Sequence, residues 1–431
     1  MHQNMSARPD GVACVKFALM GAAIVVFSAG AAMAVEPGFQ GLGDLAGGTP
    51  FSEAYAISAD GSSVVGYSSS TPGFQAYRWR SAGGMLGLGD LSGGAFSSIG
   101  LGASANGNVV VGRGLGNNGN EACRYEAGSF VALGGTIAGG FLGSQASACS
   151  AEANVIVGAR EIAGFQREAC RWVKVGANYT LQGLGDISGG QVFSIANGCS
   201  SDGSVVVGSG SSATTSEAFR WTQSGGMVSL GTLGFEGASG EAYSEANACS
   251  ADGSVVVGVS ASPTESLAFV WTTSTGVMAP LGDFAGGAVE SNALSCSADG
   301  RIIVGYGTSG VGQHAMIWTP RSGIQDLQTK LAAAGVNLTG WTLRQATGIS
   351  ADGTSICGIG VNPQGLSEGW VATLPLACDA DFNGDGFLDF TDFDDFVVAF
   401  EAGSASADFN ADGFLDFTDF DAFVSSFEAG C

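Results

Sequence analysis

The sequence predicts an all-β fold, a seven-bladed β-propeller, followed by a small α-helical module with two EF-hand-like calcium loops. Two observations predict the propeller: a unit of about 50 residues repeats along most of the 431-residue chain, and each unit reads as about four short strands. Two acidic loops of equal spacing predict the module. The expected domains are a signal peptide over residues 1–34, the propeller over 35–375 and the module over 376–431.

Composition limits the function classes. The chain holds 72 glycines, and it is 45% hydrophobic and only 13% charged, which excludes classical disorder. Its net charge of -24 repels nucleic-acid backbones and anionic lipid surfaces, so we expect no nucleic-acid partner. The sequence contains two histidines, His2 and His314, which disfavours most hydrolase triads.

The N-terminal segment has the order of a secretory signal. Arg8 and Lys16 precede an apolar run over residues 17–27, and small residues end at Ala34. We expect cleavage before Val35; an uncleaved anchor is the alternative, because residues 17–34 are uncharged and approach the ~20 residues that a membrane helix needs. The mature chain is therefore expected to be secreted or at the cell surface, with no membrane span.

A short strand that ends in glycine marks each repeat. Residues 60–66 read Asp-Gly-Ser-Ser-Val-Val-Gly, and the final glycine returns at intervals of 46 to 53 residues. An aromatic residue follows about thirteen residues later, and then a Leu-Gly-Asp triplet or a variant of it. The seven marker glycines are Gly66, Gly112, Gly158, Gly208, Gly258, Gly305 and Gly358.

Each unit is predicted to hold about four strands. In the first unit these cover residues 54–58, 62–67, 75–80 and 85–90, with a tight Asp-Gly hairpin turn between the first two. This pattern is typical of a propeller, and a parallel β-helix is the alternative. The last unit lacks its Leu-Gly-Asp strand, whereas the chain opens with an orphan copy at residues 41–45, so we infer that the first strand completes the last blade and closes the ring.

These motifs resemble a bacterial repeat family. Gly41-Leu-Gly-Asp-Leu-Ala-Gly-Gly, Ile57-Ser-Ala-Asp-Gly and Gly83-Gly-Met-Leu-Gly-Leu-Gly are similar to the HAF-type extracellular repeat of bacterial secreted proteins, over roughly residues 39–374. The resemblance implies export and a propeller-like β architecture, and it implies no settled activity. The seventh unit departs most, because it inserts residues 326–335, which read as a helical turn.

Two acidic loops near the C-terminus have calcium-loop spacing. Residues 381–392 and 408–419 place oxygen donors at loop positions 1, 3, 5, 9 and 12, a backbone carbonyl at position 7, and at position 6 a glycine that permits the sharp bend. We expect two Ca²⁺ ions, since this ion takes six to eight oxygens. The predicted ligands are Asp381, Asn383, Asp385, Phe387, Asp389, Asp392, Asp408, Asn410, Asp412, Phe414, Asp416 and Asp419.

The loops resemble those of type I dockerins, because Asp stands at position 12 and no entering helix precedes either loop. Residues 393–400 and 420–427 each carry phenylalanine at i, i+3 and i+7, which predicts two helices that pack together. The resemblance implies a cohesin-like or cell-surface partner. Loop positions 10 and 11, which the resemblance assigns to partner recognition, are Phe390-Thr391 and Phe417-Thr418.

Metal binding is expected to couple to folding, because residues 378–431 hold fourteen acidic and no basic residues. Cys378 and Cys431 bracket this segment, and we expect a disulfide between them in an oxidising compartment. The cysteines of the repeats occupy positions where other units carry apolar residues, which favours buried small hydrophobes. A bond from Cys149 to Cys123 or Cys170 stays open.

Two functions from different classes fit these features. The first is a non-catalytic secreted or cell-surface calcium-binding protein, whose propeller binds a protein or a glycan and whose module docks it. The second is an extracellular carbohydrate-active enzyme, a glycoside hydrolase or lyase, which would need a pair of carboxyl groups. Acids that recur in every unit read as turn residues. The non-repeating candidates are Glu161, Glu241 and Glu290, interpreted as exposed loop charges, and His314, interpreted as a surface residue.

Overall fold

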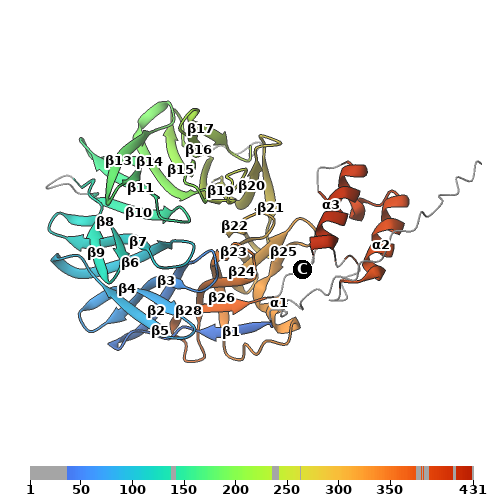
Figure 1. Cartoon of the computed structure of the whole chain (residues 1–431), viewed down its shortest axis with the longest axis horizontal. Coiled ribbons are helices and arrows are strands. Elements are labelled where there is room, and N and C mark those ends of the chain that lie inside the picture. The colour runs from blue at the N-terminus through green and yellow to red at the C-terminus, as the bar shows by residue number, and fades with distance from the viewer. Residues whose placement is uncertain are drawn as a thin grey trace, which may run out of the picture. The chain divides into compact units, whose positions relative to one another are not determined.

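The computed structural model of the protein describes residues 36–136, 142–234, 242–262, 264–374, 380, 382, 388–410 and 414–429. The predicted signal peptide, Glu241 and the Cys378–Cys431 pair lie outside these residues. Antiparallel β-sheets make up most of the described chain, and Figure 1 shows them following one another around a common centre.

The first unit matches its predicted strands closely. It contains β2 (Gly47–Ile57), β3 (Val64–Ser70), β4 (Gly73–Arg80) and β5 (Gly84–Gly89), paired in sequence order. The first strand begins earlier than predicted, because the Gly-Gly-Thr-Pro stretch at its start lacks the alternation that marks a strand. The Asp-Gly turn joins β2 to β3 as predicted.

The same antiparallel pattern recurs along the chain. Single parallel bridges join β4 to β6, β12 to β14 and β20 to β22, so pairs of units form eight-stranded sheets. The strands are β6 (Gly93–Ala103), β7 (Val110–Gly116), β8 (Gly119–Glu126), β9 (Ser129–Ala132), β10 (Ser144–Cys149), β11 (Val155–Ile162), β12 (Gln166–Val175), β13 (Asn178–Gly185), β14 (Gly189–Cys199), β15 (Val205–Ser212), β16 (Ser216–Thr222), β17 (Gly226–Gly231), β18 (Tyr243–Cys249), β19 (Val255–Ala261), β20 (Ser266–Thr272), β21 (Met278–Gly282), β22 (Gly286–Cys296), β23 (Ile303–Ser309), β24 (Gly312–Thr319), β25 (Gly323–Asp326), β26 (Thr342–Ile349), β27 (Ser355–Val361) and β28 (Ser367–Thr373).

The N-terminal strand completes the last sheet, as the sequence predicted. Strand β1 (Gly38–Gly41) pairs antiparallel with β28, with Gly38 opposite Thr373 and Gly41 opposite Trp370. The pairing begins three residues earlier than the orphan Leu-Gly-Asp copy, and the Leu42 amide extends it with a 2.9 Å hydrogen bond to the Gly369 carbonyl. The last sheet therefore has the order β1-β28-β27-β26.

A circuit of backbone hydrogen bonds links the hairpin turns of neighbouring units. In each, an amide of one turn donates to a carbonyl of the next, at 2.8 to 3.0 Å, and the last bond returns to the first turn. The described units thus form a closed ring. The donor and acceptor pairs are Asp60 to Ala105, Ala105 to Ala151, Ala151 to Ser201, Ser201 to Ala251, Ala251 to Ala298, Ala298 to Ala351 and Ala351 to Ala59.

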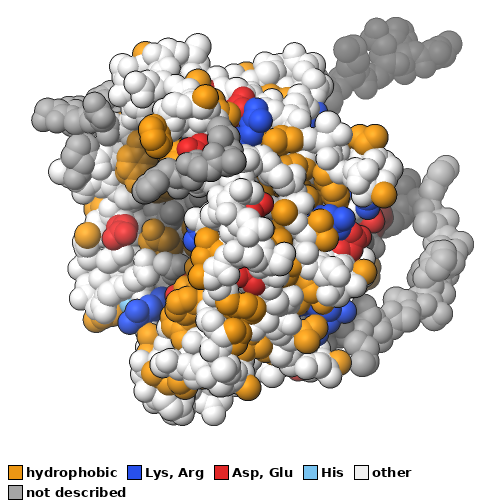
Figure 2. Space-filling view, turned by 90° about the vertical axis from the view of Figure 1, so that its left-hand side faces the viewer, with side chains coloured by type: hydrophobic (Ala, Val, Ile, Leu, Met, Phe, Trp, Pro, Cys, Tyr) orange, Lys and Arg blue, Asp and Glu red, His pale blue; other side chains and the backbone are white. Residues whose placement is uncertain are grey.

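Hydrophobic clusters fill the spaces between neighbouring sheets. Val64 and Val65 are both fully buried, although they are adjacent and point to opposite faces of β3, so this sheet is covered on both sides. The face drawn in Figure 2 carries few and scattered charged side chains, in keeping with the 13% charged residues of the chain.

The insertion of the seventh unit forms a short helix, as predicted. Helix α1 (Leu327–Ala333) begins after Asp326, whose side chain accepts from the Thr329 amide. Leu327 and Leu331 are fully buried and join the cluster around Trp370. The insertion therefore adds to the core of the last sheet.

The C-terminal module contains α2 (Phe390–Glu401), the 3-10 turn η1 (Ala405–Ala407) and α3 (Phe417–Ala429). Its core is built of phenylalanine, with Phe396 of α2 stacked on Phe423 of α3 at 4.0 Å between ring centroids. The predicted packing of the two apolar stripes is confirmed. None of the helices in the described residues has the length and apolar character needed to cross a membrane.

Candidate functional sites

The ends of the two acidic loops are described, and each buries a carboxylate. Asp392 and Asp419, the predicted ligands at position 12, are both fully buried. The Asp389 amide donates to Asp392 Oδ2 at 3.0 Å, and the Asp416 amide donates to Asp419 Oδ2 at 2.9 Å. Both loops therefore fold back on their last carboxylate in the same way.

The ligands at position 9 begin the two helices. Asp389 caps α2 and accepts from both the hydroxyl and the amide of Thr391, bonds that lower the pKa of Asp389. Asp416 accepts the same two bonds from Thr418, with the same effect on its pKa. These carboxylates are thus ionised at neutral pH.

Seven of the twelve predicted ligands lie in the described part of the chain. In the second loop, the backbone amide of Asn410 donates to Asp419 Oδ1 at 3.0 Å. Among the described residues, no group of three or more His, Cys, Asp or Glu side chains stands ready to hold a metal ion. The ligands outside the described residues are Asp381, Asn383, Asp385, Phe387 and Asp412.

The donor chemistry of these loops fits a hard cation. A buried carboxylate is costly unless a cation or several hydrogen-bond donors compensate its charge. Residues 378–431 contain no lysine, arginine or histidine, so no side chain of the module can supply positive charge to Asp392 or Asp419. Carboxylate, amide and carbonyl oxygens are the ligands that Ca²⁺ prefers.

Position 10 of each loop carries an exposed aromatic ring. Phe390 is 78% exposed and Phe417 is 77% exposed, although most phenylalanines of the module are packed. Each ring stands at the first residue of its helix, α2 or α3. The module thus presents two equivalent apolar side chains to solvent.

Acids that recur in the repeats shape turns, as the sequence predicted. Asp252 accepts from the Ser250 hydroxyl at 2.7 Å and from the Ser254 amide at 2.9 Å, and these bonds lower its pKa to about 2. In the Leu-Gly-Asp motif, Asp186 Oδ2 accepts from the Phe193 amide at 2.7 Å. The first acid fixes a hairpin turn and the second fixes a connection between units.

The predicted exposure of Glu161 is wrong. Its side chain is 5% exposed, and Oε2 accepts from the Leu142 and Gly143 amides at 2.8 and 3.1 Å. The carboxylate thus holds a loop that is distant in sequence, a role that no local pattern could indicate. Glu290 is half-buried, and the Thr308 hydroxyl donates to its Oε2 at 3.4 Å.

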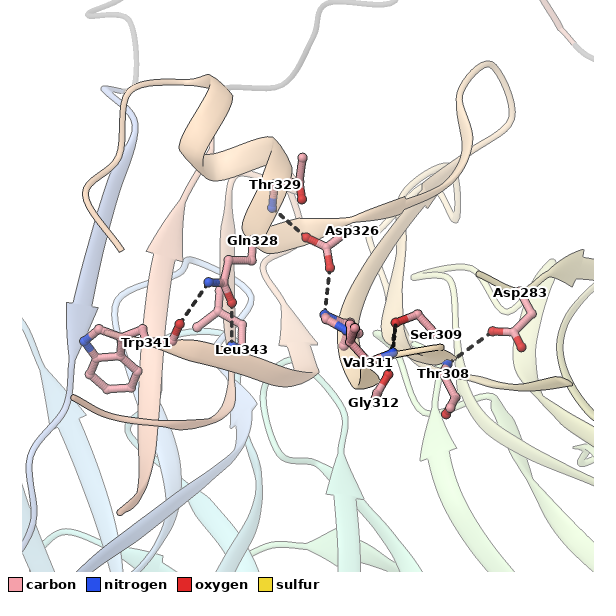
Figure 3. Close-up of polar contacts among 11 residues, drawn as sticks. Asp283, Thr308, Ser309, Val311, Gly312, Asp326, Gln328, Thr329, Trp341 and Leu343 are labelled. Carbon is pink, nitrogen blue, oxygen red and sulfur yellow. Dashed lines mark hydrogen bonds and ion pairs between the residues drawn. The ribbon is translucent and has the colours of Figure 1, made fainter. Parts of the chain in front are cut away.

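His314 is partly buried and not fully at the surface. Its side chain is 21% exposed, and Nδ1 lies 3.0 Å from Asp326 Oδ2. The same aspartate accepts from the Thr329 amide at the start of α1, and Figure 3 shows Asp326 between that helix and the neighbouring strand. The ring edge meets Phe284. His314 thus connects β24 to the insertion.

The predicted burial of the repeat cysteines holds for three of the seven, and the other four are partly exposed: Cys149, Cys199, Cys249 and Cys296. Cys123, Cys170 and Cys357 are buried, and burial raises the pKa of Cys149 to about 12. Within the described residues every cysteine is a free thiol, so the bond left open from Cys149 is not formed. These thiols are therefore unreactive members of the clusters between sheets.

A channel of about 200 Å³ runs between the innermost strands. Every unit lines it with the same two consecutive positions, of which the second holds a small residue, and all units but that of Leu294 add the next residue as well. The repeat pattern did not predict this channel. The change of side chain from unit to unit at the first of these positions was the feature of the sequence that could have indicated it. That position holds Tyr55, Leu101, Ser147, Asn197, Asn247, Leu294 and Thr347.

No known protein family and no curated protein matches the sequence. Solved structures match: puromycin hydrolase has a TM-score of 0.50 at 16% identity, over 74% of this chain and 51% of that one, so the chain spans about half its length. An oligogalacturonate lyase in complex with manganese has a TM-score of 0.47 at 12% identity, over 74% and 88%. The β-propeller domain of the Trilobed protease from Pyrococcus furiosus has a TM-score of 0.44 at 11% sequence identity, and the match covers 65% of this chain and 84% of that one. The sheet layout and the first likeness show a propeller-like all-β fold.

Proposed function

We propose that this chain is an exported seven-bladed β-propeller of HAF-type repeats whose dockerin-like C-terminal module binds two Ca²⁺ ions and docks the protein to a cohesin-like or cell-surface partner. The observation that carries the proposal is the pair of fully buried carboxylates, Asp392 and Asp419, in a module without basic residues. A Ca²⁺ ion at each loop would compensate these buried charges.

The blade count is supported by the closed circuit of backbone bonds, which returns from Ala351 to Ala59 after one turn of every repeat. Pairing of β1 with β28 supports a propeller over the alternative β-helix, because it gives the last unit four strands, as in the first unit. Docking is supported by the exposed rings of Phe390 and Phe417, which stand where the resemblance places partner recognition.

The calcium proposal is tested by titrating the full chain with CaCl₂ in a calorimeter after removal of metal with EDTA. We expect two ions per chain. Asp392→Asn and Asp419→Asn should each lose one, because an amide supplies one oxygen and no charge at position 12. Asp394→Asn, which changes an exposed acid on α2, is the matched control and should still bind two.

Circular dichroism of the same proteins provides the second measurement. Chelation should reduce the helical signal of the wild type, because apo loops leave like charges unscreened at close range. Absence of binding heat in the wild type, or equal stoichiometry in all three variants, would overturn the calcium proposal.

A further inference from the structure

The residues near the two ends of the channel differ in how far they recur from unit to unit. At one end, the hairpin turns carry the same serine and Asp or Asn chemistry in most units, as at Ser58 with Asp60 and at Ser200 with Asp202. Away from the turns, the first lining position of each innermost strand, that of Tyr55, differs in side chain between the units. The recurring end builds the ring, so the variable end is where a binding specificity can reside.

Four aromatic rings gather at the variable end of the first unit. Tyr67 lies at their centre, with ring centroids 5.5 Å from Phe51, 5.7 Å from Tyr55 and 5.5 Å from Phe74. Tyr55 stacks on Tyr67 at an interplanar angle of 16° and also lines the channel. Phe74 is 48% exposed and the other three rings are half-buried, so the cluster is open to solvent.

This aromatic cluster is not required for building a unit. Other units have the same strand pairing with non-aromatic residues at most of the equivalent positions, as Ala159 shows for Tyr67 and Leu101 for Tyr55. A residue needed for packing would recur, as the marker glycines do. Half-buried aromatic rings that depart from the repeat therefore indicate a ligand surface.

Polar groups of balanced charge border the cluster. The Tyr55 hydroxyl donates to Glu53 Oε2 at 2.8 Å, and burial together with this carboxylate raises the pKa of Tyr55, so the phenol stays neutral. Burial raises the pKa of Tyr67 and the charge of Glu53 adds to this rise, while the charge of Arg113 on β7 opposes it. The negative charge of Glu53 and the positive charge of Arg113 thus have opposite effects on the pKa of Tyr67.

Further around the channel, two of the lining side chains, Asn197 and Asn247, are amides. Asn197 Nδ2 donates to Glu245 Oε1 at 2.8 Å, and Asn247 Nδ2 donates to Asn292 Oδ1 at 2.8 Å. Amide and carboxylate oxygens accept from hydroxyl groups, and flat aromatic rings pack on apolar ring faces. A ligand with many hydroxyl groups and apolar ring faces matches both kinds of group.

We propose that the cluster of Phe51, Tyr55, Tyr67 and Phe74, with Glu53, is a binding site for an uncharged oligosaccharide at the mouth of the channel. A pyranose ring stacks on the exposed aromatic faces, and its hydroxyl groups bond to Glu53 and the channel amides. This inference rests on the propeller part of the proposed function, as the binding scaffold, and is independent of calcium.

The repeats supply variants that keep the fold. Tyr55→Leu places the residue of Leu101 and Leu294 at the same position of the first unit, and Tyr67→Ala places that of Ala159. The matched control is Phe165→Ala, which removes a 76% exposed aromatic ring from the turn between β11 and β12. All three would be compared with the wild-type full chain by circular dichroism.

Binding is measured by calorimetry with cellohexaose and xylohexaose, with trigalacturonate as the charged comparison, in CaCl₂ and again in EDTA. We expect at least one neutral hexaose to bind, with a tenfold or greater increase of Kd in Tyr55→Leu and in Tyr67→Ala and none in Phe165→Ala. Equal affinity in EDTA would separate this site from the calcium module. Binding of trigalacturonate alone, no binding of either hexaose, or equal loss in the control would overturn the inference.

Discussion

At the residue scale, the marker glycine of each unit is fixed by a close backbone approach. Gly208 stands on β15 opposite Ala196, beside the point where the register of β14 shifts. A Cβ on Gly208 would overlap the carbonyl oxygen of Ile195, and the other marker glycines meet an equivalent carbonyl. The innermost strand thus approaches its neighbour closely at a position that has no side chain.

Gly208→Ala should therefore destabilise the protein. The added methyl group forces β14 and β15 apart, and we expect a loss of about 1–3 kcal/mol in the free energy of unfolding, as for an overpacked core. Urea denaturation followed by tryptophan fluorescence would measure it. Gly83→Ala is the control, because a Cβ there meets nothing within 4 Å. Equal midpoints for the two variants would contradict the steric explanation.

At the scale of the element, most hairpin turns contain an Asp or Asn side chain that accepts hydrogen bonds within the turn. Asp252 holds the turn between β18 and β19, while Asn106 accepts the equivalent bonds from Ser104 and Asn108 in the second unit. Asp and Asn thus form the same turn, and only Asp titrates.

This difference predicts a pH effect. The pKa of Asp252 is about 2 in the folded chain, below the ~3.9 of an unfolded aspartate, so its contribution to stability is present above about pH 4 and is lost as the pH falls toward 2. Asp252→Asn should keep the fold and flatten the fall of stability between about pH 4 and 2. Thermal melting across this range measures the slope, and parallel slopes for both proteins would contradict the prediction.

Buried serines connect one repeat unit to the next. Ser98 of β6 accepts from the Ala76 amide of β4 at 3.0 Å and donates to the Gly89 carbonyl of β5 at 2.5 Å. Ser291 of β22 makes the equivalent bonds to Ala268 and Gly282. Removing such a hydroxyl would leave a buried donor and a buried acceptor unpaired. The serine recurs in every unit except the last, which has Arg344 at this position.

Local features of the fold could be predicted from sequence, and contacts between units could not. The Asp-Gly turns and the i, i+3, i+7 phenylalanines depend on neighbours in the chain, so their patterns predicted structure correctly. Glu161 is buried because a separate loop donates amides to it. Tyr55 stacks on Tyr67 because the register between β2 and β3 shifts next to Tyr55. The alternation of apolar and polar residues in the sequence does not predict such a shift.

At the scale of the whole molecule, one short strand closes the ring. Phe39 of β1 packs against Trp341 at 5.0 Å between centroids, and Ser52 of the first sheet accepts from the Gly369 amide of the last and donates to the Gly43 carbonyl. The first and last units are therefore held by the same kind of serine bonds that Ser98 and Ser291 make between other neighbouring units, although more than 300 residues separate Ser52 from Gly369.

Deleting residues 36–41 should open this ring. Strand β28 would become an unpaired edge, and Trp341 and Trp370 would lose their contact with Phe39, so we expect a lower melting temperature and concentration-dependent aggregation. Gln40→Ala keeps the backbone of β1 and changes an exposed side chain, and it should melt as the wild type does. Differential scanning calorimetry with light scattering measures both effects. A deletion variant that melts with the wild type and stays monomeric would mean that the remaining sheets close without β1.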